Sequence, residues 1–225
     1  APRSSAAALV LRGPSGIGKT SLAQALLTQL RADPDCLVFS SRCFVHESVH
    51  YNAFDGIIDG LASHLQSLSP HALARLTPRG VGALVQLFPA LRGWFGPCQV
   101  GAANELLRTT AFTALRELLS QLAARGRVVL FLDDLQWADA DSAQLLSALL
   151  GSGLGPVFLL ATWRSDVVPT QPLAAALAQF EALQLGPLPP AAAAALVRAQ
   201  LTGCDGPLAS EIVARAAGHP LHVWE

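Results

Sequence analysis

The sequence predicts an α/β fold, in which a doubly wound parallel sheet of about five strands is followed by a small helical lid. Short apolar runs alternate with amphipathic helical patterns along most of the chain, which is typical of βαβ units. A glycine-rich loop separates the first apolar run from the first helix, and a later run ends in two adjacent aspartates. Doubly wound folds bind ligands at the carboxyl ends of their strands, so both features are expected at one edge of the sheet.

The individual elements follow from the same pattern. Strands are expected at residues 8–11, 36–45, 128–132, 157–162 and 182–185. The central runs lack polar alternation, so helices should cover both faces of the sheet. Those helices are expected at 21–27, 53–66, 71–76, 79–92, 104–124, 141–150 and 172–180, with a loop at 93–101. After the proline-rich stretch 186–190 only helices are expected, at 191–201 and 208–217.

Composition suggests three parts. Residues 1–7 are expected to be a linker remnant, residues 8–186 the core, and residues 187–225 the start of a truncated helical lid. A chain of 225 residues has room for one α/β domain with a small appendage. It contains no methionine, so we expect it to be an excised part of a larger protein.

Charge and cysteine usage narrow the class of protein. No apolar stretch reaches the length of a membrane span, and no signal peptide is present, so neither a membrane partner nor export is expected. The net charge of −1, without a cluster of basic residues, argues against a nucleic-acid surface. The four cysteines form no C-x-x-C pair and are expected to be reduced thiols of a cytoplasmic protein.

The glycine-rich loop is the strongest functional signal. It fills every fixed position of G-x-x-x-x-G-K-[ST], which predicts a P-loop between a strand and a helix. Lys19 is the only lysine beside fourteen arginines, and it stands where a β- or γ-phosphate needs a compact cation. We expect Lys19 to be catalytic and Thr20 to place its hydroxyl on Mg²⁺. The residues expected to bind the nucleotide here are Gly13, Pro14, Ser15, Gly16, Ile17, Gly18, Lys19, Thr20 and Ser21.

The aspartate pair predicts the acidic half of the same site. The apolar run at 128–132 continues directly into Asp133 and Asp134, which is the Walker B pattern. Asp133 is expected to hold Mg²⁺, and Asp134 to orient or polarise the attacking water. The alternative, a capping role for the pair, is weakened because Asp139 and Asp141 already stand before the next helix. With a strand between the two motifs, the chain is expected among P-loop NTPases that carry an extra strand beside the P-loop.

The run at 157–162 ends in Thr162, Trp163 and Arg164. A cation at this position lies beside the aspartate strand and can sense a γ-phosphate, so Arg164 is expected to be catalytic. The alternative is a surface arginine paired with Asp166.

With these motifs in place, the chain resembles a known class. The stretches 133–139, 161–164 and 218–221 are similar to the STAND class of signal-transduction ATPases, which are related to AAA+ proteins. Residues 42–55 are similar to a segment of bacterial multidomain regulators that are fused to serine/threonine protein kinases. The resemblance implies ATP/ADP and Mg²⁺ as cofactors, and attached kinase, winged-helix or repeat domains. It also implies that Pro220 lies near adenine, while His219 replaces an expected asparagine and leaves its own role open.

One further motif points to different chemistry. Residues 46–50 match H-E-x-x-H, the pattern of zinc proteases. That chemistry needs both histidines on one helical face and a third ligand downstream, whereas the preceding residues favour a strand. We therefore do not expect a zinc site.

The function that these patterns favour is an ATP-binding, slowly hydrolysing switch whose lid position, self-association or attached effector domains depend on the bound nucleotide. Three rivals stay open: a nucleotide-binding scaffold without turnover, a DNA-directed AAA+ ATPase and a small-molecule kinase. The chain contains no base-reading motif, so the choice of ATP over GTP rests on the resemblance alone.

Overall fold

A computed structural model describes residues 7–45, 50–95, 105–151, 156–200 and 207–223. Its centre is a five-stranded sheet in which every adjacent pair of strands is parallel. The strands are β1 (Ala7–Gly13), β2 (Cys36–Arg42), β3 (Arg127–Asp133), β4 (Val157–Arg164) and β5 (Glu181–Gln184), in the order β2-β3-β4-β1-β5. The expectation of an α/β fold with a parallel sheet of about five strands is confirmed.

The strand order decides which residues meet at the carboxyl edge. β4 lies between β1 and β3, with Gly13 opposite Arg164 and Leu132 opposite Ala161. The glycine loop that follows β1 and the aspartates that end β3 are therefore separated only by the end of β4. This arrangement matches the expected extra strand beside the P-loop.

Helices and short 3₁₀ turns connect the strands. They are α1 (Lys19–Arg31), α2 (Asp55–Gln66), α3 (Pro70–Ala74), α4 (Val81–Leu87), η1 (Pro89–Leu91), α5 (Arg92–Phe95), α6 (Glu105–Ala123), η2 (Leu135–Trp137), α7 (Ala140–Leu150), α8 (Gln171–Leu177), α9 (Pro190–Gln200), α10 (Pro207–Ala216) and η3 (Pro220–Val223). None of the helices in the described ranges combines the length and the apolar character needed to cross a membrane.

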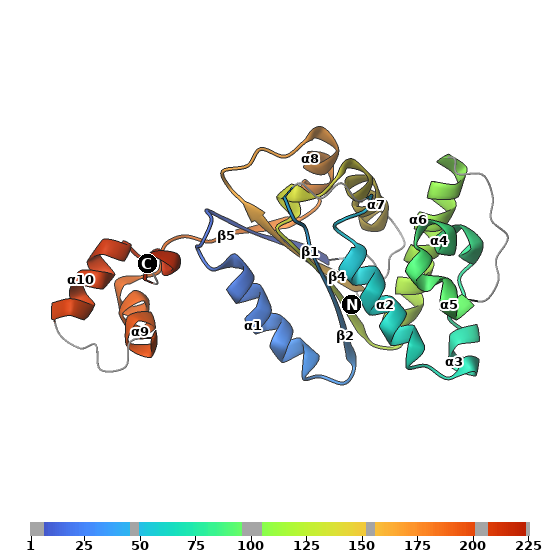
Figure 1. Cartoon of the computed structure of the whole chain (residues 1–225), viewed down its shortest axis with the longest axis horizontal. Coiled ribbons are helices and arrows are strands. Elements are labelled where there is room, and N and C mark those ends of the chain that lie inside the picture. Colours follow the sequence, from blue (N-terminus) through green and yellow to red (C-terminus); the bar gives the residue numbers. More distant parts are fainter. Residues whose placement is uncertain (1–6, 46–49, 96–104, 152–155, 201–206, 224–225) are drawn as a thin grey trace.

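The two faces of the sheet carry cores of different size. Alternate strand residues such as Leu130 and Phe131 point to opposite faces. Leu130 belongs to the larger cluster, built with α2, α4, α6, α7 and α8, whereas Phe131 joins a small cluster with Ala23 and Leu27 of α1. Figure 1 shows α1 on one side of the sheet and the other core helices gathered at the opposite side.

Three expected elements differ from the structure. The second strand ends at Arg42 rather than at residue 45, because the chain leaves the sheet after Cys43 donates its N–H to Asp133 O at 3.0 Å. The helix expected at 79–92 ends at Leu87, since Pro89 has no N–H to continue it. The turn that follows continues into α5, which begins at Arg92 and extends into the segment expected as a loop at 93–101.

The chain after β5 reaches back to the glycine loop. The helices α9 and α10 lie at the end of the molecule away from α2 and α6 (Figure 1). The N–H of Leu188 donates to Gly218 O at 2.7 Å, which joins the start of this segment to the end of α10. A Cβ on Gly16 would lie 2.7 Å from Leu221 Cβ, so η3 packs directly on the loop.

Candidate nucleotide site

The loop between β1 and α1 has the backbone that its glycines permit. Gly16 and Gly18 adopt φ of 74° and 99°, in the left-handed region that side chains rarely enter. Gly18 precedes α1, and its carbonyl oxygen accepts the N–H of Leu22 at 2.9 Å. The free N–H groups of the first helical turn therefore face the loop, where an anion is favoured.

Lys19 is held inside this loop. Its Nζ donates to the carbonyl oxygens of Gly13 at 3.0 Å and Pro14 at 2.7 Å. The side chain is buried, and burial lowers the pKa of Lys19 below its ordinary value, against the opposing effect of the Asp134 carboxylate. The ammonium is thus bonded to carbonyl oxygens of its own loop, and it lines the cavity described below.

Asp133 joins the two motifs. Its Oδ1 accepts the hydroxyl of Thr20 at 2.8 Å and the hydroxyl of Thr162 at 2.7 Å. Asp133 is only 3% exposed, and a buried carboxylate beside a threonine hydroxyl is the hard oxygen set that Mg²⁺ prefers. The donor set at Thr20 and Asp133 therefore fits the metal expected there.

Asp134 has an unusual backbone and a crowded carboxylate. Its φ of 55° and ψ of 43° lie in the left-handed region, and its N–H donates to Thr162 Oγ1 at 2.8 Å. Gln136 Nε2 donates to Oδ1 at 2.9 Å, and Arg42 Nη2 lies 3.1 Å from Oδ2. Both carboxylate oxygens of Asp134 therefore have a partner.

Arg164 forms the ion pair with Asp166 that was the alternative interpretation, while its catalytic role stays a prediction. Its guanidinium forms a fork with Asp166, with Nε 3.2 Å from Oδ1 and Nη2 2.6 Å from Oδ2. This hydrogen bond raises the pKa of Arg164 and lowers that of Asp166. The same arginine also lines the cavity above the loop.

A cavity of about 310 Å³, called the loop cavity here, gathers the predicted residues. It is lined by Ser15, Gly16, Gly18, Lys19, Thr20, Ser21, Arg42, Asp134, Arg164, Pro220 and Leu221. The other predicted loop residues, Gly13, Pro14 and Ile17, flank it, and Asp133 lies behind Thr20. The structure therefore brings all the predicted site residues to one place, although their roles stay predictions.

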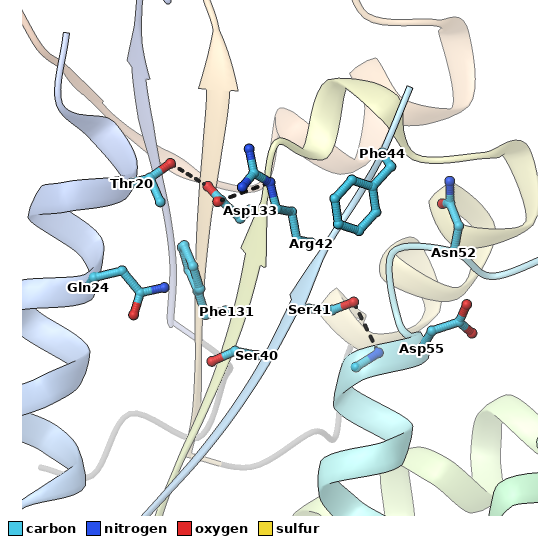
Figure 2. Close-up of a pocket in the computed structure, with 11 residues that line it drawn as sticks. Thr20, Gln24, Ser40, Ser41, Arg42, Phe44, Asn52, Asp55, Phe131 and Asp133 are labelled. Carbon is cyan, nitrogen blue, oxygen red and sulfur yellow. Dashed lines mark hydrogen bonds and ion pairs between the residues drawn. The ribbon is translucent and has the colours of Figure 1, made fainter. Parts of the chain in front are cut away.

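A second cavity of about 380 Å³ adjoins the first along the ends of β2 and β3. Figure 2 shows it between α1, β2 and the start of α2, with Thr20, Arg42 and Asp133 at its upper rim. The guanidinium of Arg42 lies 5.7 Å from the centre of the Phe44 ring. Arg42 and Thr20 line both cavities, and Arg42 also pairs with both aspartates.

The end of the described chain contributes two histidines, one just before η3 and one within it. The rings of His219 and His222 stack with centroids 4.4 Å apart. A Cβ on Gly16 would lie 2.9 Å from His219 Cε1, so this ring touches the loop. Pro220 between them lines the loop cavity. Its predicted place near adenine is not tested by the structure.

The H-E-x-x-H stretch lies largely outside the described residues, which exclude 46–49. His50 is described, and it stands in a turn rather than a helix. Its Nδ1 lies 2.5 Å from Asp141 Oδ2, and Arg108 lies 3.1 Å from the other oxygen of the same carboxylate. Asp139 caps α7 by accepting the N–H of Ser142. Asp141 of α7 therefore connects His50 with Arg108 of α6.

Sequence reasoning missed three residues that organise the site. Thr162 holds both aspartates, Gln136 bonds the carboxylate of Asp134, and Arg42 pairs with both acids. A hydroxyl in an otherwise apolar run was a usable signal for Thr162. No comparable signal marks Gln136 or Arg42, because their partners come from the strand order and the turn after β3.

The chain resembles solved structures of other proteins in its fold. The Aeropyrum pernix ORC1 protein, solved in complex with DNA, is 18% identical with a TM-score of 0.50, and the match covers 97% of this chain and 51% of that protein. A STAND protein with a tetratricopeptide repeat sensor from Pyrococcus horikoshii is 17% identical with a TM-score of 0.49, and the match covers 96% of this chain and 26% of that protein. The chain thus spans about a quarter to a half of these proteins. At such identities the likeness concerns the fold alone.

No curated protein sequence matches the chain significantly. The family model described as an AAA ATPase domain matches residues 1–160, which is most of the chain. This match confirms the expectation of an AAA-related P-loop module. The chain belongs to the AAA ATPase domain family.

Proposed function

We propose that this chain is an ATP-binding, slowly hydrolysing module that acts as a signal-transduction switch of the STAND type. The observation that carries the proposal is the convergence of Lys19, the Thr20–Asp133 pair, Asp134 and Arg164 around one cavity. Membership of the AAA ATPase family supports a nucleotide as ligand. Adenine in place of guanine rests on the resemblance to STAND proteins.

The binding roles follow from the geometry. Backbone N–H groups of the loop and of the first turn of α1 receive the β- and γ-phosphates, and Lys19 moves from the Gly13 and Pro14 carbonyls to a phosphate oxygen. Thr20 and Asp133 would hold Mg²⁺, which would neutralise charge on the phosphates.

Hydrolysis is favoured when Asp134 exchanges its arginine partner, and Arg164 its aspartate partner, for water and phosphate. Asp134 orients the attacking water, and Arg42 competes with that water for Oδ2. Arg164 contacts the γ-phosphate in competition with Asp166. Two such exchanges before each turnover support a slow ATPase.

The switch role rests on the contact between η3 and the loop. Leu221 and His219 lie against Gly16, so a bound polyphosphate changes the surface on which the lid rests. Pro220 is placed near adenine. Nucleotide state would then bias lid position, self-association or attached kinase, winged-helix or repeat domains in the cytoplasm. We propose no nucleic-acid contact by this fragment.

Calorimetric titration of Mg-ATP, with GTP in parallel, tests the assignment of the site. Lys19→Ala should abolish binding, because the phosphates lose their only ammonium, while Arg198→Ala on the exposed face of α9 should leave binding unchanged. Asp134→Asn should retain binding and lose phosphate release. Intact affinity in the Lys19 variant would refute the phosphate site.

One observation favours a second candidate, a nucleotide-binding scaffold without turnover. Both oxygens of Asp134 already have partners, so an attacking water has to compete with Gln136 and Arg42 for this carboxylate. Phosphate release by the parent that equals release by Asp134→Asn, with normal binding in both, would favour the scaffold over the ATPase.

A further inference from the structure

A glutamine side chain bridges the ends of β3 and β4. Gln136 lies in the turn η2 and is 8% exposed. Its Nε2 donates to Oδ1 of Asp134 at 2.9 Å, and its Oε1 accepts the backbone N–H of Arg164 at 3.2 Å. One buried amide thus contacts the residue proposed to orient water and the backbone of the residue proposed to contact the γ-phosphate.

The two contacts fix the amide in one orientation. Turned over, it would place its oxygen against the Asp134 carboxylate and its NH₂ against the N–H of Arg164, and both contacts would be repulsive. Only a side chain with a donor and an acceptor at this spacing satisfies both partners. Glutamate at 136 could still accept from Arg164, but it would present a second negative charge to Asp134.

The hydrogen bond from Gln136 fixes the rotation of the Asp134 carboxylate, which the backbone leaves free. Thr162 and the left-handed backbone hold the main chain of Asp134 but not the rotation of its carboxylate. Two side chains set that rotation, and they differ in exposure. The Arg42 side chain is 57% exposed and has room to swing into the loop cavity, whereas Gln136 is buried and bonded at both ends. Gln136 is therefore the partner that stays when Arg42 leaves.

From this geometry we propose that Gln136 is the positioning residue for hydrolysis, holding the Asp134 carboxylate in register with the Arg164 end of β4. The inference rests on the proposed ATPase function and adds a residue to it. A shift of the Arg164 backbone on phosphate contact is transmitted through the amide to the carboxylate. Gln136 acts through Asp134 and does not itself touch the nucleotide.

The experiment measures Mg-ATP turnover and nucleotide affinity in Gln136→Met, which keeps the size and removes both hydrogen bonds. We expect kcat to fall by about 10- to 100-fold, as small misplacements of catalytic groups do, with affinity nearly unchanged. In the Asp134→Asn background the same substitution should cause no further loss, because the two residues act as one unit. Gln144→Met, the same change at an exposed site on α7, is the matched control and should leave kcat as it is.

Exchanging the charged and amide side chains of residues 134 and 136 gives a second test, which measures the unfolding temperature instead of turnover. Gln136→Glu should lower the unfolding temperature, because two carboxylates then face each other. Adding Asp134→Asn restores the hydrogen bond with the roles exchanged, because the new amide at position 134 donates to the new carboxylate at position 136. The unfolding temperature should therefore recover while turnover stays lost. Failure of the swap to recover stability overturns the bridge.

The outcomes distinguish failure of the positioning role of Gln136 from failure of the proposed ATPase function. Normal turnover in Gln136→Met, with turnover lost in Asp134→Asn, overturns the positioning role and leaves the ATPase intact. An additional loss from Gln136→Met in the Asp134→Asn background also overturns it. Parent turnover equal to that of Asp134→Asn refutes hydrolysis itself and the inference with it.

Discussion

Three cationic side chains at the proposed nucleotide site already have oxygen partners within the protein. Lys19 is bonded to the loop carbonyls, Arg164 to Asp166, and Arg42 to Asp134. Each cation is satisfied by an oxygen of the protein, which avoids leaving a buried or crowded charge unpaired. Under the proposed function, nucleotide binding exchanges these contacts for contacts with phosphate.

Burial of Lys19 leads to a prediction about pH. Because burial lowers the pKa of this ammonium, affinity for Mg-ATP should fall as pH rises through that lowered value, before an ordinary lysine would lose its proton. Calorimetry at about pH 7.5 and about pH 9.5, in two buffers of different ionisation enthalpy, measures the affinity and the proton uptake. The arginine in Lys19→Arg keeps its charge over this pH range. This variant should bind Mg-ATP more weakly than the parent, and its affinity should not change with pH. Equal pH dependence in both proteins would contradict the role of the lysine proton.

At the scale of elements, α2 is joined to the sheet partly through a histidine. The ring of His64 meets Phe39 of β2 edge-on, with centroids 6.2 Å apart. Burial, helped by the nearby charge of Arg125, lowers the pKa of His64 below 6.5. The folded chain therefore holds this ring neutral at a pH where the unfolded chain begins to protonate it.

This leads to a prediction about acid stability. The stability that the neutral His64 ring gives the folded chain is fully present above about pH 6.5. It is lost as pH falls from there toward the lowered pKa of the folded state, because the unfolded chain takes up the proton first. Urea unfolding at about pH 7.5 and about pH 5.5 should show a smaller acid loss in His64→Gln than in the parent. His71→Gln, at an exposed position of α3, should leave the loss unchanged, and an equal effect of both substitutions would refute the assignment.

The end of α10 leads to a third prediction. Gly218 has φ of 76°, and a Cβ there would lie 2.5 Å from the carbonyl oxygen of Leu188, which is backbone and cannot step aside. Gly218→Ala should displace η3 from the loop and weaken Mg-ATP binding. Gly186→Ala is the matched control, since its Cβ would meet nothing within 4 Å. Equal affinities in the two variants would show that lid contact does not matter to binding.

Sequence reasoning located most accurately the strands whose run of apolar residues is unbroken. The strands β1, β3 and β4 are continuous apolar runs, and their motifs fixed where the loop and the aspartates should meet. Pro89 was a visible signal for the end of α4, whereas α5 spans only one turn and carries no periodicity. The left-handed backbone of Asp134 was not predictable, because Thr162 and η2 impose it from outside the local sequence.

For the molecule as a whole, the site couples the sheet, α1 and the lid, so ligand binding should stabilise the fold. With Mg-ATP at 100 times its Kd, the gain is about 2.7 kcal/mol. For a chain of this size that raises Tm by roughly 5 to 10 °C. A thermal melt with and without nucleotide measures the shift, which should be absent in Lys19→Ala. A shift of equal size in that variant would place the ligand elsewhere.

The contact of η3 with Gly16 also bears on timing. Leu221 and Pro220 line the loop cavity, and Leu221 packs against Gly16. Under the proposed function, a nucleotide in this cavity is covered by this short segment, and the diphosphate product leaves only after η3 moves away. The rate of that movement would then set how long each signalling state lasts, and substitutions in η3 would change this lifetime without changing the chemistry at the phosphates.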